Sequence, residues 1–145
     1  MRRGSIYDAL GAADLASALT ANPDDREMRR WRAYHYATSG AFTKAMADYE
    51  ALLRSDPADA KAYQARGDLW LMHKHVKEAI ADYRKAGEIE AVEPSEALVA
   101  CRASASWTTA FFHCTLVAFD PRQSAENRAY AETRISAAVP KPSIP

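Results

Sequence analysis

Two groups of histidine and cysteine residues are the parts of this chain that could bind a metal ion. His73 and His75 lie at the end of a predicted helix, and Cys101 precedes the adjacent pair His113 and Cys114. Residues two apart do not share a helical face, so His73 and His75 are interpreted as a solvent-exposed corner. The second group offers three ligands, whereas a structural zinc site needs four. We therefore predict that the cysteines are buried thiols, and we expect no metal and no cofactor.

Catalytic motifs are absent from the sequence. It contains no Gly-rich phosphate loop, no Gly-x-Ser-x-Gly elbow and no His-Glu-x-x-His pair. Asp48 and Asp82 could supply paired carboxylates, but they occupy the same position in two copies of a repeated sequence, which indicates a structural role. We expect that the chain is not an enzyme. The alternative is a small enzyme or metalloprotein that uses Cys101, His113 and Cys114.

Aromatic and basic residues gather around Trp31, where Arg30, Tyr34 and Tyr36 could stack on single-stranded nucleic acid. The chain as a whole has 19 basic and 19 acidic residues, so it has no net attraction to phosphate. We therefore expect no nucleic-acid partner. The same balance weakens repulsion between copies and favours a homo-oligomer.

The sequence also predicts no insertion into a membrane. The longest apolar run, residues 107–119, is too short to cross a bilayer. The first ten residues carry two arginines but no apolar core of a signal peptide. We therefore predict a cytoplasmic location.

A shift of 34 residues superimposes much of the sequence on itself. Ala45–Tyr49 (AMADY) falls on Ala79–Tyr83 (AIADY), and the match extends outward from there. Each copy predicts two antiparallel helices joined by a short turn. The first copy is expected to form helices over 24–38 and 42–54, with Asp24 and Glu27 capping the first of them, and the second copy over 59–73 and 76–89.

The flanking segments match this pattern less well. Residues 5–21 are predicted to form one helix carrying Ile6, Leu10, Leu15 and Leu19. Residues 95–119 are interpreted as a degenerate third copy starting at a Ser95 cap, with a β-hairpin as the alternative because Thr, Phe, Val and Trp favour strands. Ser124 is predicted to cap a final helix with a polar outer face.

The repeated unit resembles the tetratricopeptide repeat, with a small residue in its first helix and Ala followed by an aromatic residue in its second. The second copy carries Gly67, Trp70, Ala79 and Tyr83 at the family's positions, but Lys74 replaces the usual turn glycine. The resemblance implies an all-α fold, an α-α superhelix (solenoid) of helix-turn-helix repeats. It divides the single domain 1–145 into a leading half repeat (5–22), repeats 24–58 and 59–93, a degenerate repeat (94–120), a capping helix (123–139) and a tail (140–145).

The same resemblance implies a function, because the first helices of such repeats line a concave surface that binds proteins. In this register the concave stripe mixes charged, aromatic and flexible side chains: Glu27, Arg30, Tyr34, Thr38, Lys61, Gln64, Asp68, Leu71, Met72 and Arg102. We predict a non-catalytic scaffold that binds a protein or peptide along this stripe. The alternative is a module that self-associates through its N-terminal half repeat or the apolar segment 107–119.

Gly67 has a structural explanation in this scheme. Glycine costs a helix about 1 kcal/mol relative to alanine. The sequence predicts that the two helices of the second repeat cross closely at Gly67, with Trp70 and Tyr83 packed around the contact.

Overall fold

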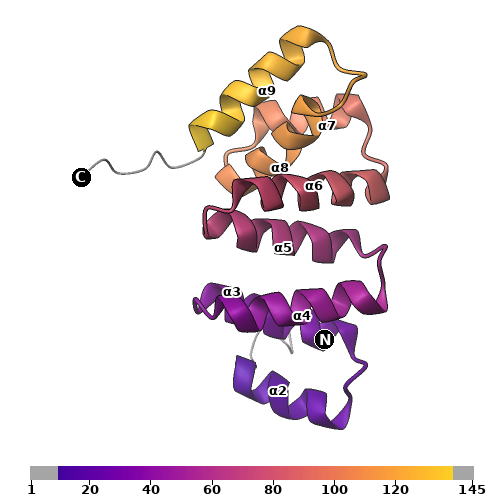
Figure 1. The fold of residues 1–145 in the computed structure, drawn as a ribbon, viewed down its shortest axis with the longest axis vertical. Helices are drawn as coiled ribbons and strands as arrows, with labels where there is room; N and C mark the ends of the chain where they lie inside the picture. Colours follow the sequence, from indigo (N-terminus) through magenta and orange to yellow (C-terminus); the bar gives the residue numbers. More distant parts are fainter. Residues whose placement is uncertain (1–9, 139–145) are drawn as a thin grey trace, which may run out of the picture.

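The computed structural model describes residues 10–138, which form a stack of helices with no strand among them (Figure 1). The helices are α2 (Ala12–Ala21), α3 (Arg26–Thr38), α4 (Phe42–Ser55), α5 (Ala60–Met72), α6 (Val76–Glu90), α7 (Pro94–Ala103), α8 (Trp107–Ala118) and α9 (Ala125–Ala138). The predicted all-α repeat fold is confirmed. The β-hairpin alternative for residues 107–119 is wrong, because α8 covers this segment.

Side-chain caps explain where three of the eight described helices begin. The side chain of Asp25 accepts a hydrogen bond from the backbone N–H of Met28 at 2.9 Å, so Asp25 caps α3 and the prediction of Asp24 is wrong by one residue. Asp59 caps α5 in the same way, accepting from the N–H of Ala62 at 3.0 Å. At the C-terminal end, Ser124 accepts from Asn127 and caps α9 as predicted.

Two predicted helix starts differ from the structure. The N-terminal helix is predicted over 5–21. Residues 5–9 lie outside the described range, and within it α2 begins at Ala12, after the cap residue Gly11, whose backbone is extended. Leu10 therefore lies outside the helix, and Ile6 lies outside the described residues, as does the predicted tail. The helix α7 begins at Pro94, with Glu93 as its cap, rather than after Ser95. Proline suits the first helical position because its missing N–H would be unpaired there anyway.

In each of the first two helical pairs, α3–α4 and α5–α6, an Arg–Asp ion pair at equivalent positions joins the two helices. Arg32 on α3 donates two hydrogen bonds to Asp48 on α4, at 2.8 and 2.6 Å. Arg66 and Asp82 repeat this geometry between α5 and α6, with both distances at 2.8 Å. Hydrogen bonding to the partner carboxylate raises the pKa of both arginines. This supports the structural role predicted for Asp48 and Asp82.

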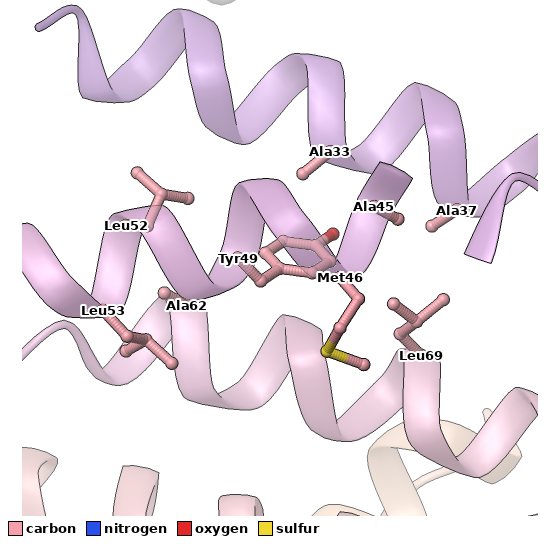
Figure 2. Packing of buried hydrophobic residues seen from close by; sticks show 9 residues of the cluster. All are labelled: Ala33, Ala37, Ala45, Met46, Tyr49, Leu52, Leu53, Ala62 and Leu69. Atoms are coloured by element: carbon pink, nitrogen blue, oxygen red, sulfur yellow. The ribbon is translucent and has the colours of Figure 1, made fainter. Parts of the chain in front are cut away.

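The pairs stack through buried apolar side chains. In Figure 2 the ring of Tyr49 lies in the layer where α3, α4 and α5 meet, and Met46 of the same helix extends toward Leu69 on α5. Farther along the stack, Phe111 and Phe112 of α8 pack against Tyr83 of α6, with ring centroids 6.0 and 5.3 Å away. Thus α8, and not α7, is the helix that packs on α6, while α7 and α9 both pack on α8 (Figure 1).

Cys101 and Cys114 form a disulfide between α7 and α8, so the prediction of buried free thiols is wrong. Both residues are buried as expected. The two residues face each other across the hairpin with their Cα atoms 4.7 Å apart, a separation that permits the bond. Cysteine spacing in a sequence does not reveal pairing. The metalloprotein alternative loses its thiolate ligands, because disulfide sulfurs cannot act as thiolates.

Candidate peptide-binding pocket

A surface pocket of about 460 Å³ lies between the first helices of the two regular pairs. It is lined by residues from α3, α4 and α5: Glu27, Arg30, Trp31, Tyr34, Tyr49, Lys61 and Ala65. The two sides of the pocket come from α3 and α5, and Tyr49 reaches it from α4. The elements that build it are those whose ends are set by the caps at Asp25 and Asp59.

Three aromatic rings give the pocket its apolar character. Trp31 and Tyr34 meet edge to face on α3, with their centroids 6.0 Å apart. Tyr34 is 53% exposed, which is unusual for a large aromatic side chain, whereas Tyr49 is only 3% exposed. Burial raises the pKa of Tyr49, so its hydroxyl stays protonated and can donate a hydrogen bond. The pocket therefore offers ring surface at its rim and a polar hydroxyl deeper inside.

The cations of the pocket differ in what they are free to bind. Arg30 donates to Asp59 at 2.7 Å, and Asp59 also binds Arg26. Burial raises the pKa of Asp59, but hydrogen bonds from the Ala62 backbone and both arginines outweigh this and hold the pKa below its usual range. Lys61, in contrast, is exposed and makes no ion pair with any residue of the described range 10–138. Lys61 is therefore the cation available to an incoming carboxylate.

Asp68 lies on α5, one turn beyond Ala65, and accepts a hydrogen bond from the hydroxyl of the buried Tyr83. Burial raises the pKa of Asp68, and the bond from Tyr83 only partly offsets this effect. One of its oxygens is thus used to fix Tyr83. Asp68 has a structural role that its position in the predicted stripe did not reveal.

The structure brings together only part of the predicted stripe. Four of its residues line the pocket: Glu27, Arg30, Tyr34 and Lys61. Thr38, Gln64, Asp68 and Met72 do not line it, although Thr38 and Met72 are exposed. Leu71 is only 4% exposed and belongs to the same buried cluster as Phe111, so it presents little surface to a partner. Arg102 does not line the pocket either. It donates a hydrogen bond to Asn127 and stacks on the ring of Tyr130, both toward α9.

Sequence reasoning missed three lining residues, Trp31, Tyr49 and Ala65. Tyr49 occupies the aromatic position in the second helix of the repeat, which predicts burial in the core but not a place at the pocket. Trp31 and Ala65 occupy equivalent positions 34 residues apart, next to the stripe positions Arg30 and Gln64. A wider stripe would have included both of them, because an apolar helical face spans more than one row of residues.

The family of the chain follows from this repeat geometry together with sequence comparison. The family profile described as tetratricopeptide repeat matches residues 9–60 and, in a second overlapping match, residues 42–90. The chain belongs to the tetratricopeptide repeat family. These tetratricopeptide matches contain all of α2 to α6, and therefore every residue that lines the pocket. No curated protein and no solved structure matches the chain.

Membership in this family favours protein partners, because tetratricopeptide repeats usually serve as non-catalytic interaction scaffolds. Among residues 10–138, no three histidine, cysteine, aspartate or glutamate side chains are grouped as metal ligands would be. No helix in the same range is long and apolar enough to cross a membrane. The chemistry of the pocket is therefore that of its aromatic rings, its hydroxyl and its charged rim.

Proposed function

We propose that the chain is a non-catalytic scaffold that binds a peptide segment of another protein in the pocket between α3 and α5. The observation that carries this proposal is the exposed Tyr34, paired with the partly buried Trp31 beside the hydroxyl of Tyr49, in a pocket of about 460 Å³. Exposed aromatic residues in a concave site are the side chains that contribute most to binding proteins. A surface that is already formed also avoids the cost of ordering loops upon binding.

The pocket indicates which side chains the partner supplies. A large apolar or aromatic side chain fits against Trp31, Tyr34 and Ala65, where it loses contact with water. A carboxylate next to it pairs with Lys61, whose ammonium group has no anionic partner in the described part of the chain. The partner is therefore a peptide that carries an acidic residue close to a bulky apolar one.

Peptides selected from a displayed random library test this proposal directly. Their affinity for the wild-type chain is compared with that for Tyr34→Ala and Lys61→Ala by fluorescence polarisation. We expect Tyr34→Ala to weaken binding by about tenfold or more, as truncation of a central aromatic contact does. Lys61→Ala is expected to weaken binding less, and less still at high salt, because an exposed ion pair is screened.

Matched controls come from the other end of the stack. Tyr130 is also an exposed tyrosine but lies on α9, and Lys77 is an exposed lysine on α6. Tyr130→Ala and Lys77→Ala should leave binding unchanged. If the selected peptides bind Tyr34→Ala as tightly as wild type, or lose as much affinity with the controls, the pocket is not the binding site.

Self-association stays an alternative, but one of its two proposed surfaces is occupied. The apolar segment 107–119 is mostly buried against α6, α7 and α9, and its exposed large apolar residues are the two at its ends, Trp107 and Phe119. The cytoplasmic location also stays a prediction. The disulfide counts against it, because buried structural disulfides are typical of oxidising compartments.

A further inference from the structure

Equivalent positions hold the two helices together in each hairpin of the stack. In the second hairpin the eighth residues of the two helices are Gly67 and Tyr83. These residues touch, since a Cβ atom on Gly67 would lie only 2.6 Å from the tyrosine ring. In the third hairpin, α7–α8, the eighth residues are Cys101 and Cys114. The disulfide therefore stands where the earlier hairpin has a close packing contact.

The third hairpin also lacks the ion pair of the first two. The seventh residues of α5 and α6 are Arg66 and Asp82, which share two hydrogen bonds. The seventh residues of α7 and α8 are Ala100 and His113. The imidazole of His113 has a buried Nδ1 atom with no hydrogen-bond partner, and burial lowers its pKa. Both noncovalent contacts that close the regular hairpins are thus replaced here by one covalent bond.

Apart from the disulfide, α7 is held by apolar packing on α8, where Ala97 and Leu98 share a cluster with Val117 and Ala118. It makes no comparable contact with α5 or α6 within the described residues. Its polar links lead only to α9 and the loop before it: Gln123 donates to the carbonyl of Pro94, Arg102 to Asn127, and Arg134 to the carbonyl of Ser104. Arg102 and Asn127 meet at an exposed site, where water competes for the hydrogen bond. The disulfide is the strongest connection between α7 and the rest of the stack.

We propose that the Cys101–Cys114 disulfide makes the packing of α7 on α8, at the C-terminal end of the stack, depend on the redox state of the chain. In the oxidised chain it holds α7 against α8. A dithiol reductant cleaves the S–S bond, each cysteine sulfur receives one electron and one proton, and the reductant is itself oxidised to a disulfide. The reduced hairpin keeps its apolar packing but neither an ion pair nor a covalent bond, so α7 opens away from α8 more readily while α3 to α6 stay folded.

Burial of the two sulfur atoms makes reduction of the disulfide slow. Neither cysteine has any exposed surface, so a reductant reaches the bond only when α7 has already moved away from α8. The chain is therefore expected to keep the bond during brief exposure to reductant and to lose it during prolonged exposure. The pocket between α3 and α5 lies in the part of the stack that remains folded, so this inference is independent of the proposed function.

Hydrogen exchange measured by mass spectrometry on the full chain tests the proposal. The oxidised protein is compared with protein kept in dithiothreitol, after alkylation in denaturant has verified zero and two free thiols respectively. We expect the amides of α7 to exchange about tenfold faster or more after reduction, and those of α4 and α6 to change by less than about twofold. Equal exchange of α7 in both states overturns the proposal, as does an equal increase in all helices. Two free thiols in protein handled without reductant also overturn it.

Two variants distinguish the effect of losing the disulfide from any other effect of the reductant on the protein. Cys101→Ala with Cys114→Ala should exchange like the reduced chain and should no longer respond to dithiothreitol. Adding Ala100→Arg and His113→Asp to this background builds the ion pair of the other hairpins at its equivalent positions. These additions should restore slow exchange in α7. Slow exchange of α7 in the double-alanine variant, or no recovery with the ion pair, contradicts the proposal.

Discussion

Gly67 shows how one missing side chain fixes the distance between two helices. A Cβ atom at this position would lie 2.6 Å from Cε1 and 2.8 Å from Cδ1 of Tyr83, well inside contact distance. The ring of Tyr83 is fully buried between α5, α6 and α8, and its hydroxyl is bonded to Asp68. The ring therefore has little freedom to move aside. The close crossing predicted from the sequence at Gly67 is confirmed.

Gly67→Ala is expected to destabilise the chain by about 1–3 kcal/mol, because overpacking outweighs the helix propensity gained. Urea unfolding followed by circular dichroism measures the change. Gly87→Ala is the matched control in the same helical hairpin. A Cβ atom there would meet the flexible end of Leu116, a partly exposed side chain that can move, so its effect should be smaller. Unaltered stability of Gly67→Ala would refute the packing argument.

At the scale of the helix, the Arg–Asp pairs are the contacts that recur with the repeat. Asp82 is buried, with an 8% exposed side chain, and both its oxygens accept from Arg66. Arg66→Leu leaves this carboxylate without its cation and is expected to cost about 3 kcal/mol. Replacing both residues by leucine removes the stranded charge, so the double variant should be less destabilised than the sum of the two single variants.

A double-mutant cycle in urea measures this coupling, and the same cycle at Arg32 and Asp48 provides a second copy of the experiment. The first pair has the same hydrogen-bond geometry, but Arg29 also lies 3.6 Å from Asp48, so loss of Arg32 leaves a second cation nearby and the coupling energy should be smaller than that of Arg66 and Asp82. Additive single and double variants would show that the pairs do not stabilise the hairpins. The third hairpin offers no such cycle, since Ala100 and His113 occupy its positions.

The helices themselves were largely predictable because their boundaries depend on local chemistry. Asp59 before α5, Gly40 after α3 and Ser124 before α9 act within one turn of the chain, so the residue types alone indicate the boundary. Lys74 takes the turn position of Gly40 in the second hairpin with φ of 64°, where glycine would be favoured. The repeat spacing, and not the residue type, predicted this second turn.

Contacts between distant segments were less accessible from the sequence. The apolar composition of 107–119 indicated burial or assembly, but not that α8, rather than α7, would pack on α6. The disulfide likewise depends on two positions meeting across a hairpin, which the spacing of two cysteines does not encode. Four of the ten stripe residues line the pocket, because the register of the stripe follows the repeat whereas the depth of Tyr49 and Leu71 depends on packing.

At the scale of the whole molecule, the stack is held together by contacts between successive neighbours, so its stability depends on each interface in turn. The interface between α6 and α8 rests on Phe111 and Phe112, which pack on Tyr83. Phe112 is 3% exposed, and its replacement by alanine is expected to cost about 3–5 kcal/mol at this interface. The C-terminal helices should therefore unfold at a lower urea concentration than α3.

Trp31 on α3 and Trp107 on α8 allow this to be observed at both ends of the stack. Single-tryptophan variants, with the other two tryptophans changed to Phe, report urea unfolding at each site. In the parent protein the two midpoints should coincide. With Phe112→Ala the Trp107 midpoint should fall well below that of Trp31. Met46→Ala, which leaves a cavity in the first hairpin, should instead lower the Trp31 midpoint more. Coincident midpoints in both variants would mean that the stack unfolds as one cooperative unit and that its interfaces cannot be uncoupled.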